Sequence, residues 1–254
     1  MGLRDNPIVT VVIPTHRHTP VGLQGFRDQD VPTTVLVLAN GGVTGVEGDT
    51  VLQVEWMGHG ATRMAAIEFI TTEYTLFSVD DATPVGEGAV RALVDAITEG
   101  PYDAVFGRQI PHEGADIITT ERLSEWTPEG SNHYKTDRHD HVFALYKTST
   151  LREFPLPNVA IAEDLHWSIA QRIGYVPNGA VIHSHKRRPL ELYRRTKAIH
   201  RELKVIGREP LIPSFRSLIS ALPGVIKPTM RAGVREFPNQ IAELFGQWQG
   251  GKTE

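Results

Sequence analysis

Short apolar runs alternate along the chain with segments in which apolar residues recur every three or four positions. The second pattern predicts helices at 60–70 and 89–97. The first pattern, rich in β-branched residues and bounded by polar or Gly-containing turns, predicts buried strands at 8–13, 34–38, 74–79 and 104–106. Because strands and helices alternate, we expect an α/β fold built on a largely parallel sheet with helices on its faces.

The pattern changes after the fourth strand. Residues 107–141 show no clear period and are rich in polar side chains, so we expect long loops over one edge of the sheet. Loops in such positions often shape a substrate site. A helix is expected to begin near Ala162 and to carry Leu165, Ile169 and Ile173 on one side, with a strand following at 180–182.

Recurrent prolines from Pro210 onward break the last part of the chain into short apolar segments. We therefore expect a main domain at 1–206 and a C-terminal appendage of short helices at 207–254. Within the appendage, residues 214–245 mix apolar and basic side chains, a composition typical of an amphipathic helix. Such a helix could pack on the main domain, on a second copy of the chain or on the inner face of a membrane, and the pattern leaves all three open.

Charge and composition narrow the classes of function. The 254 residues carry 26 Lys and Arg against 30 Asp and Glu, a net charge of −4, which argues against a nucleic-acid binder. Without cysteine there can be no disulfide, thiolate zinc site or iron–sulfur cluster, so any metal must bind Asp, Glu or His. The first residues are charged where a secretory signal is apolar, and no run of about 18 apolar residues occurs, so we expect a cytoplasmic protein.

Two adjacent carboxylates, Asp80 and Asp81, directly follow the strand expected at 74–79. In sheets of this kind, ligands bind beyond the carboxyl ends of the strands. Neighbouring carboxylates repel each other unless a cation offsets them, and Mg²⁺ or Mn²⁺ favours oxygen ligands and often bridges to a phosphate. The pair therefore indicates a metal-assisted phosphate site, with a solvated turn that caps the next helix as the alternative.

A second acidic pair and a histidine pair follow later in the chain. Glu163 and Asp164 stand at the start of the helix expected near residue 162, while His183 and His185 share one face of an extended segment. Acidic residues at a helix start favour its dipole without any further role, and histidine pairs are common on surfaces. The functional alternatives are a general base in the acidic pair and a metal ligand among the histidines.

The order of these features carries a family resemblance over roughly residues 7–206. The chain resembles inverting family 2 glycosyltransferases of the GT-A fold, and rhamnosyltransferase-like members in particular. That fold is a Rossmann-like, mostly parallel sheet flanked by helices. The segments that carry the resemblance are VTVVIPTHRH, GATRMAA, VDDATP, AEDLHWSIAQRIGY and GAVIHSH.

The resemblance implies a role for each candidate residue. Asp164 is expected to be the general base, with Glu163 beside it contacting the acceptor or orienting the site. Asp81 and His183 are expected to bind the metal, and His183 is preferred over His185. Contacts to the sugar-nucleotide donor are expected from Pro14, Thr15, His16, Asn40, Arg63 and Asp80.

The resemblance also implies the reaction. A hexosyltransferase of this type uses Mn²⁺ or Mg²⁺ to move a sugar from a UDP, dTDP or GDP donor to a hydroxyl of a glycan or lipid-linked acceptor, with inversion, in polysaccharide biosynthesis. The residue types suit it, because a cation stabilises the departing diphosphate and a carboxylate takes the proton of the hydroxyl.

Two departures from the family pattern keep an alternative open. Val79 stands at the first acidic position of the Asp-x-Asp metal motif, and Ala39 stands where relatives commonly have an Asp. These positions favour a nucleotide-sugar binding module without catalysis. A sugar-1-phosphate nucleotidyltransferase is a weaker alternative, because the loop PTHRHTP lacks the glycines that cradle phosphates in those enzymes.

Overall fold

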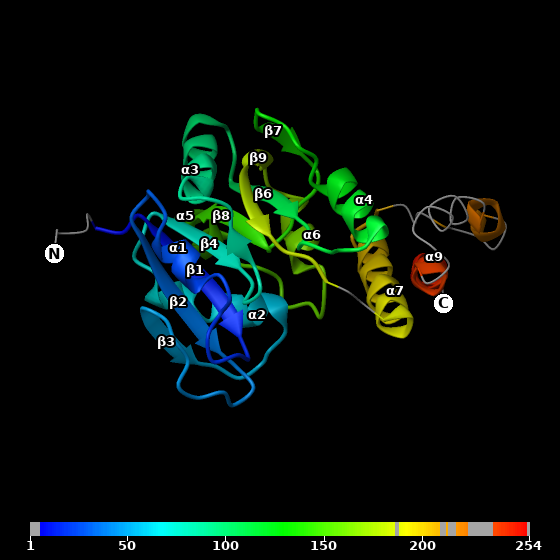
Figure 1. Cartoon of the computed structure of the whole chain (residues 1–254), viewed down its shortest axis with the longest axis horizontal. Coiled ribbons are helices and arrows are strands. Elements are labelled where there is room, and N and C mark those ends of the chain that lie inside the picture. Colours follow the sequence, from blue (N-terminus) through cyan, green and yellow to red (C-terminus); the bar gives the residue numbers. More distant parts are fainter. Residues whose placement is uncertain (1–5, 186–187, 209–211, 213–216, 223–235, 253–254) are drawn as a thin grey trace. The chain divides into compact units, whose positions relative to one another are not determined.

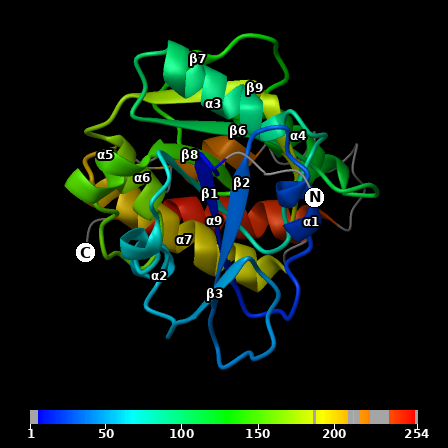
Figure 2. The same ribbon diagram turned by 90° about the vertical axis from the view of Figure 1, so that its left-hand side faces the viewer.

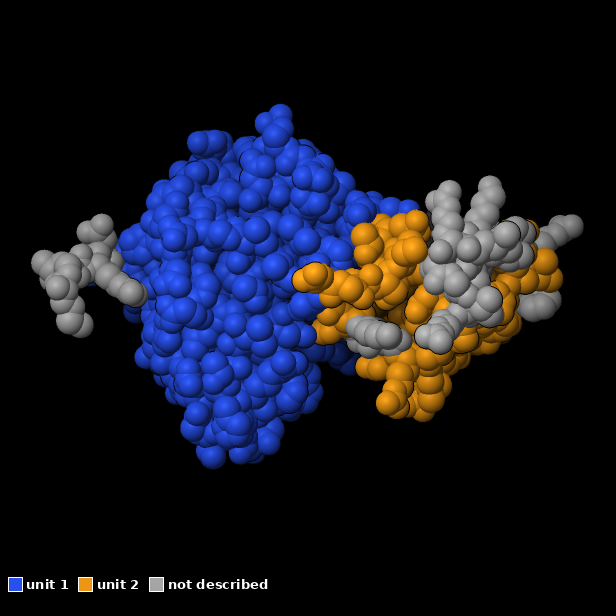
Figure 3. Space-filling model, in the orientation of Figure 1, with its two compact units in different colours: residues 1–112, 123–183 blue, residues 113–122, 184–254 orange. Residues whose placement is uncertain are grey.

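The computed structural model describes residues 6–185, 188–208, 212, 217–222 and 236–252. The chain forms two compact units, coloured separately in Figure 3: residues 1–112 with 123–183, and residues 113–122 with 184–254. We refer to them as unit 1 and unit 2. Their division at residue 183 differs from the boundary expected at residue 206.

Unit 1 contains a nine-stranded sheet with the strand order β3-β2-β1-β4-β8-β6-β9-β5, and β7 pairs beside β9 (Figure 1). The sheet is mixed, since β8 runs antiparallel to both of its neighbours, and β5 and β7 run antiparallel to β9. The expectation of parallel pairing is confirmed for β3, β2, β1 and β4, and for β6 with β9. The strands are β1 (Val9–Thr15), β2 (Thr33–Ala39), β3 (Thr50–Gln53), β4 (Tyr74–Ser78), β5 (Thr83–Pro84), β6 (Ala104–Ile110), β7 (Tyr134–Thr136), β8 (Phe143–Lys147) and β9 (Ile173–Ile182).

Helices cover both faces of this sheet because its central strands are apolar on both sides. In β1, Val11 belongs to a core with Leu93 of α3, whereas the next residue, Val12, belongs to a second core with Trp167 of α6. Figure 2 shows α3 lying along β6 and β9. The helices and one 3₁₀ turn are α1 (Leu23–Arg27), α2 (His59–Met64), η1 (Ile67–Phe69), α3 (Ala89–Glu99), α4 (Ile117–Trp126), α5 (Thr148–Glu153) and α6 (Glu163–Ser168).

Three expected elements differ from the structure. The helix expected at 60–70 is split into α2 and η1, and the segment 107–141 contains the end of β6, α4 and β7 in addition to loops. The helix expected to reach Ile173 ends at Ser168, so Ile169 lies beyond it and is 55% exposed, and Ile173 begins β9. Leu165 and Ile173, which the pattern placed on one helix face, therefore belong to a short helix and a long strand.

Unit 2 is built on two helices, α7 (Pro189–Val205) and α9 (Phe237–Gly251), which pack together. A Cβ atom at Gly250 would lie 2.4 Å from the carbonyl oxygen of Lys197, so glycine at this position permits the close approach. The helix expected over 214–245 lies partly outside the described residues. Within the described part of the chain, no helix is long and apolar enough to cross a membrane.

Strand register determines which polar residues meet at the carboxyl end of the sheet. Val12 of β1 pairs in parallel with Phe77 of β4, so the residues three further on, Thr15 and Asp80, lie side by side. Thr83 of β5 pairs antiparallel with Ile182, which brings the chain before β5 next to the chain after β9. Acidic and histidine residues distant in sequence therefore share one edge of the sheet.

Candidate active site

Asp80 is held at the end of β1 by three side chains. Its Oδ2 accepts a 2.8 Å hydrogen bond from the Thr15 hydroxyl and lies 3.3 Å from Arg17 Nε and 3.7 Å from His16 Nδ1. The Asp80 side chain is only 13% exposed, whereas the ring of His16 is largely exposed. The pairing of β1 with β4 therefore fixes the carboxylate and leaves His16 accessible to a ligand.

The loop after β2 lies beside the end of β1. The backbone N–H of Asn40 donates to the Thr15 carbonyl over 2.9 Å, and Gly41 and Gly42 follow with φ values of +68° and +76°. A side chain at either glycine would be strained in this left-handed conformation. Four of the six expected donor contacts, Thr15, His16, Asn40 and Asp80, thus lie together, and Pro14 precedes them within β1.

Asp81 and His183 meet beside this loop. Asp81 Oδ1 lies 3.5 Å from His183 Nε2. The other ring nitrogen of His183, Nδ1, contacts the side-chain oxygen of Gln109 at 2.8 Å, and the Gln109 amide nitrogen donates to Asp140 Oδ2 at 2.9 Å. An ionised Asp140 can only accept, so the side chain of Gln109 turns its NH₂ group toward Asp140 and its oxygen toward His183. Because that oxygen can also only accept, His183 carries a proton on Nδ1.

A cation fits this arrangement. In its neutral form, with the proton on Nδ1, His183 directs the lone pair of Nε2 toward the carboxylate of Asp81, so that two ligand atoms converge. A carboxylate oxygen and an imidazole nitrogen are ligands that suit Mn²⁺ and related ions.

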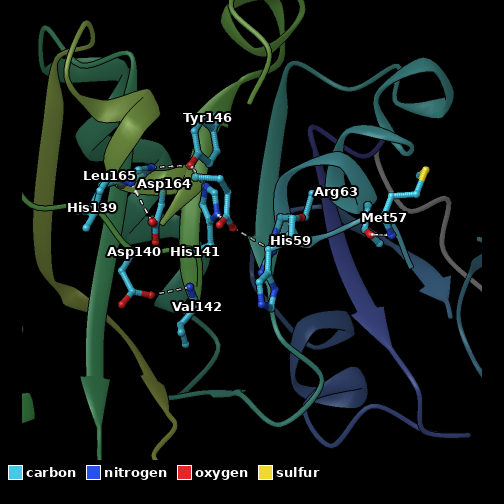
Figure 4. A network of polar contacts seen from close by, with 12 residues as sticks. Met57, His59, Arg63, His139, Asp140, His141, Val142, Tyr146, Asp164 and Leu165 are labelled. Carbon is cyan, nitrogen blue, oxygen red and sulfur yellow. Dashed lines mark hydrogen bonds and ion pairs between the residues drawn. The ribbon is translucent and has the colours of Figure 1, made fainter. Parts of the chain in front are cut away.

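Glu163 belongs to a buried polar network whose other members include Arg63, His141 and Tyr146, which Figure 4 labels. Its Oε1 contacts His141 Nδ1 at 3.0 Å and Arg63 Nη1 at 3.4 Å, and the residue is 5% exposed. Burial alone would raise the pKa of the Glu163 carboxyl, but the hydrogen bond with His141 and the charges of His141 and Arg63 lower it to about 2. Glu163 is therefore ionised at neutral pH, and its ion pair with Arg63 was not predicted from the sequence.

The charge on Glu163 fixes one proton of this network. An ionised carboxylate only accepts, so His141 carries a proton on Nδ1. The other ring nitrogen of His141, Nε2, lies 2.5 Å from the Tyr146 hydroxyl oxygen, which also lies 2.5 Å from His139 Nε2. Burial lowers the pKa of His139 well below its usual value, which keeps its ring neutral. The Tyr146 hydroxyl therefore links His139 to the contact of His141 with Glu163.

Asp164, the next residue, has a different environment. It is partly exposed, and its Oδ1 accepts a 2.8 Å hydrogen bond from the Leu165 amide. Burial, together with the negative charges of Glu163 and Asp140, raises the pKa of the Asp164 carboxyl to about 6, against the opposing charge of His141. A carboxylate with a pKa near neutrality that is still ionised at pH 7 has the properties of a general base.

The local sequence positions this acidic pair in three ways. Ala162, with φ of 63°, is the sole residue other than glycine with positive φ in the described part of the chain, and it turns the chain sharply into α6. Gly60 lets α2 approach, since a Cβ there would lie 3.2 Å from Glu163 Cγ and 2.7 Å from the Pro157 carbonyl. Trp167 anchors α6 through a 2.7 Å hydrogen bond to the Phe154 carbonyl. Backbone strain of the kind at Ala162 is frequent at functional sites.

A line of contacts leads from Asp81 to Asp140, and the last step, from Asp140 to Asp164, is electrostatic. From Asp81 the contacts pass through His183 and Gln109 to Asp140, whose charge acts on Asp164. Sequence reasoning missed Gln109 and the histidine–tyrosine network. The segment 107–141 was expected to form loops, and residues 139–141 do lie outside the helices and strands, but His139 and His141 are buried, at 1% and 4% exposed. The apolar run VFALY directly after His141 was the signal that these residues lead into a buried strand.

Comparisons with known proteins give one related sequence and many related folds. No protein-family model matches the chain. The O-antigen chain rhamnosyltransferase RfbN of Salmonella typhimurium is 23% identical over 219 residues, which cover 74% of this chain and 69% of RfbN.

Two of the solved structures with a similar fold are those of glycosyltransferases. The mannosyltransferase PcManGT from Pyrobaculum calidifontis, solved with GDP-Man and Mn²⁺, matches 96% of this chain and 86% of its own with a TM-score of 0.68 and 16% identity. TarS 1–349 of S. aureus, solved with UDP-GlcNAc, matches 94% of this chain and 89% of its own with a TM-score of 0.54 and 14% identity. The chain therefore has the GT-A fold and is glycosyltransferase-like in sequence and in architecture.

Proposed function

We propose that the protein is a metal-dependent, inverting glycosyltransferase of family 2 that moves a hexose from a nucleoside-diphosphate sugar to an acceptor hydroxyl. The observation that carries this proposal is a polar network that runs from Asp81 and His183 through Gln109 to Asp140, whose negative charge acts on Asp164 beside Glu163. Displacement at a sugar carbon needs one group for the leaving diphosphate and another for the incoming hydroxyl. The network provides both within one unit of the fold.

The donor end comprises the residues around Thr15. His16, Asn40 and Asp80 would contact the nucleotide and its sugar, and Asp81 with His183 would hold Mn²⁺ or Mg²⁺. When bound, the ion stabilises the negative charge that develops on the departing diphosphate. Gln109 would keep the Nε2 lone pair of His183 directed toward the ion, and Asp140 would keep Gln109 in place. Arg63, expected as a donor contact, is buried against Glu163 and would act on the base end through this ion pair.

The acceptor end uses the different pKa values of two adjacent carboxylates. Asp164 takes the proton of the acceptor hydroxyl as its oxygen bonds to the anomeric carbon, and the bond from that carbon to the diphosphate breaks at the same time. The products are the glycoside and a nucleoside diphosphate, with the anomeric configuration inverted. Glu163 stays ionised, and its charge helps to keep the pKa of Asp164 raised, which makes Asp164 a stronger base.

A screen of sugar nucleotides by thermal shift tests this proposal. The UDP, dTDP and GDP sugars would each be added with Mn²⁺ and with EDTA, because a ligand that binds only the native state raises its melting temperature. We expect stabilisation by at least one donor in the presence of Mn²⁺ and little in EDTA. If no sugar nucleotide stabilised the protein at millimolar concentration, the proposal would be wrong.

A binding module without catalysis is the second candidate, favoured by Val79 and Ala39 at positions that are acidic in relatives of the family it resembles. The two candidates differ in turnover. A glycosyltransferase slowly hydrolyses its donor when water replaces the acceptor, and it releases the nucleoside diphosphate. A binding module would be stabilised by the same donor without releasing any product, which a coupled assay of nucleoside diphosphate measures directly.

A further inference from the structure

A cavity of about 620 Å³ lies in unit 1 outside the contacts described above. Its volume falls in the range of about 300 to 1,000 Å³ that is typical of small-molecule sites. The end of α4 and the strand β7 contribute to its lining, together with one residue each from β6 and β9. Most of its lining residues lie in the segment 107–141, for which the sequence predicts loops that shape a substrate site, although no single residue there was assigned a role.

Aromatic rings supply much of the cavity surface. Tyr175 and Phe106 are buried with their ring centroids 5.2 Å apart, and the ring of Tyr134, which is 46% exposed, packs against Tyr175 at 5.4 Å. Trp126 is held by Arg138, whose guanidinium lies 5.1 Å from the indole ring and donates to the Trp126 carbonyl at 2.9 Å. These contacts fix the rings in place before any ligand arrives.

The charged residues of the lining balance one another. Glu125 and Asp137 carry negative charge, while Lys135 and Arg138 carry positive charge. The Arg138 guanidinium is already engaged by two backbone carbonyls, so it is not arranged to bind a phosphate. The lining therefore suits a neutral ligand that has apolar faces and polar edges. A pyranose ring has this character, with C–H groups on its faces and hydroxyls around its edge.

The cavity also borders the acidic network. The Phe106 ring, which lines the cavity, packs against the His139 ring at a centroid distance of 5.8 Å. His139 contacts Tyr146, which connects through His141 to Glu163. One aromatic ring therefore separates the cavity from the hydrogen bonds that hold the proposed catalytic pair.

We propose that this cavity binds a pyranose ring of the acceptor saccharide, with Tyr134 as an aromatic contact at its edge. The proposal rests on the function proposed above and adds the place in the fold where a saccharide acceptor binds. It also makes the residues around Tyr134 determinants of acceptor specificity that are distinct from the donor contacts around Thr15.

The test is binding of simple sugars by saturation-transfer difference NMR. The probes are methyl rhamnoside, methyl mannoside and N-acetylglucosamine, added while Mn²⁺ and the nucleoside diphosphate found in the donor screen fill the donor site. We expect at least one sugar to bind the wild type. Tyr134→Ala should weaken that binding roughly two- to tenfold, the effect of losing one aromatic contact, whereas Tyr134→Phe should retain it. Phe69→Ala removes a ring that is 52% exposed elsewhere in unit 1 and serves as the matched control.

The outcomes separate the two proposals. If the wild type binds the sugar nucleotide but no probe sugar, or if Tyr134→Ala binds the sugar as tightly as Phe69→Ala does, the role of the cavity is refuted and the proposed function stands. If the wild type binds no sugar nucleotide, the proposed function fails, and the acceptor role of the cavity fails with it.

Discussion

Glu163→Gln should destabilise the protein because it leaves a buried charge without its partner. The substitution keeps the size of the side chain but removes the negative charge that faces Arg63 and His141. Both Glu163 and Arg63 are almost fully buried, with side chains 6% and 5% exposed, so solvent screens this pair little. Breaking such a pair by removing one member typically costs about 3 to 5 kcal/mol.

The pKa of Glu163 gives an independent magnitude. Its fall from an ordinary 4.5 to about 2 corresponds to about 3 kcal/mol of stability, at roughly 1.4 kcal/mol for each pKa unit. Part of the loss is offset in the variant, because Asp164 no longer faces the negative charge of Glu163. We therefore expect a loss of about 2 to 3 kcal/mol at pH 7, or roughly 5 to 10 °C in melting temperature.

The sign of the pH dependence provides a stricter check. A carboxyl whose pKa is lowered on folding contributes its full stability above its unfolded value and loses it as the pH falls through the folded value. The contribution of Glu163 to the difference in unfolding free energy between wild type and Glu163→Gln should therefore be constant above about pH 5 and shrink toward pH 2. The opposing contribution of Asp164 should disappear as that carboxyl protonates below about pH 6, so the difference should rise slightly between pH 7 and pH 5 before it shrinks. Urea denaturation at several pH values, followed by circular dichroism, measures this difference.

Glu129→Gln is the matched control, since Glu129 pairs with Arg108 on the surface and its side chain is 80% exposed. Surface pairs contribute about 0 to 1 kcal/mol, so this variant should unfold nearly like the wild type. A Glu163→Gln variant as stable as the control, or a deficit that does not change between pH 7 and pH 3, would refute the reasoning about the buried ion pair.

Three further predictions concern the site. Asp164→Asn should reduce sugar transfer by roughly a hundred- to ten-thousandfold, the usual contribution of a general base, and a normal transfer rate would remove Asp164 from that role. In the wild type, kcat should fall as the pH drops through about 6, because protonation of Asp164 abolishes the base; a flat profile down to pH 5 would contradict this. Gln109→Leu should weaken Mn²⁺ binding about 10- to 100-fold in a titration followed by electron paramagnetic resonance, whereas Gln24→Leu, on the surface, should leave it unchanged.

The elements that were predictable from the sequence are those whose pattern is complete within a short window. Strands buried on both faces read as continuous aliphatic runs, which is why β1, β2 and β4 were found close to their observed bounds. β3 was missed because its four residues are at most half-buried, so that no apolar run marks it. The prediction of a helix that reaches Ile173 was wrong, because the apolar residues Leu165 and Ile173 have helical spacing by chance and lie in a helix and a strand.

The candidate site was likewise predictable only where its residues follow a local sequence pattern. Its acidic residues were visible as pairs at the ends of predicted elements, and register then brings Asp80 to Thr15. The network behind them depends on tertiary contacts that no local pattern contains. Nothing in the sequence around Tyr146 indicates that its hydroxyl lies between two histidines, and Gln109 acquires its role only because β6 ends beside both Asp140 and His183.

The most direct test of the central claim, that a metal end and a base end share one site, is calorimetric titration of the nucleoside diphosphate found in the donor screen. Wild type, Asp81→Asn and Asp164→Asn would each be titrated with and without Mn²⁺. We expect Mn²⁺ to tighten binding in the wild type and in Asp164→Asn, and to have little effect in Asp81→Asn. Equal binding by all three proteins with Mn²⁺, or no dependence on Mn²⁺ in the wild type, would contradict the account.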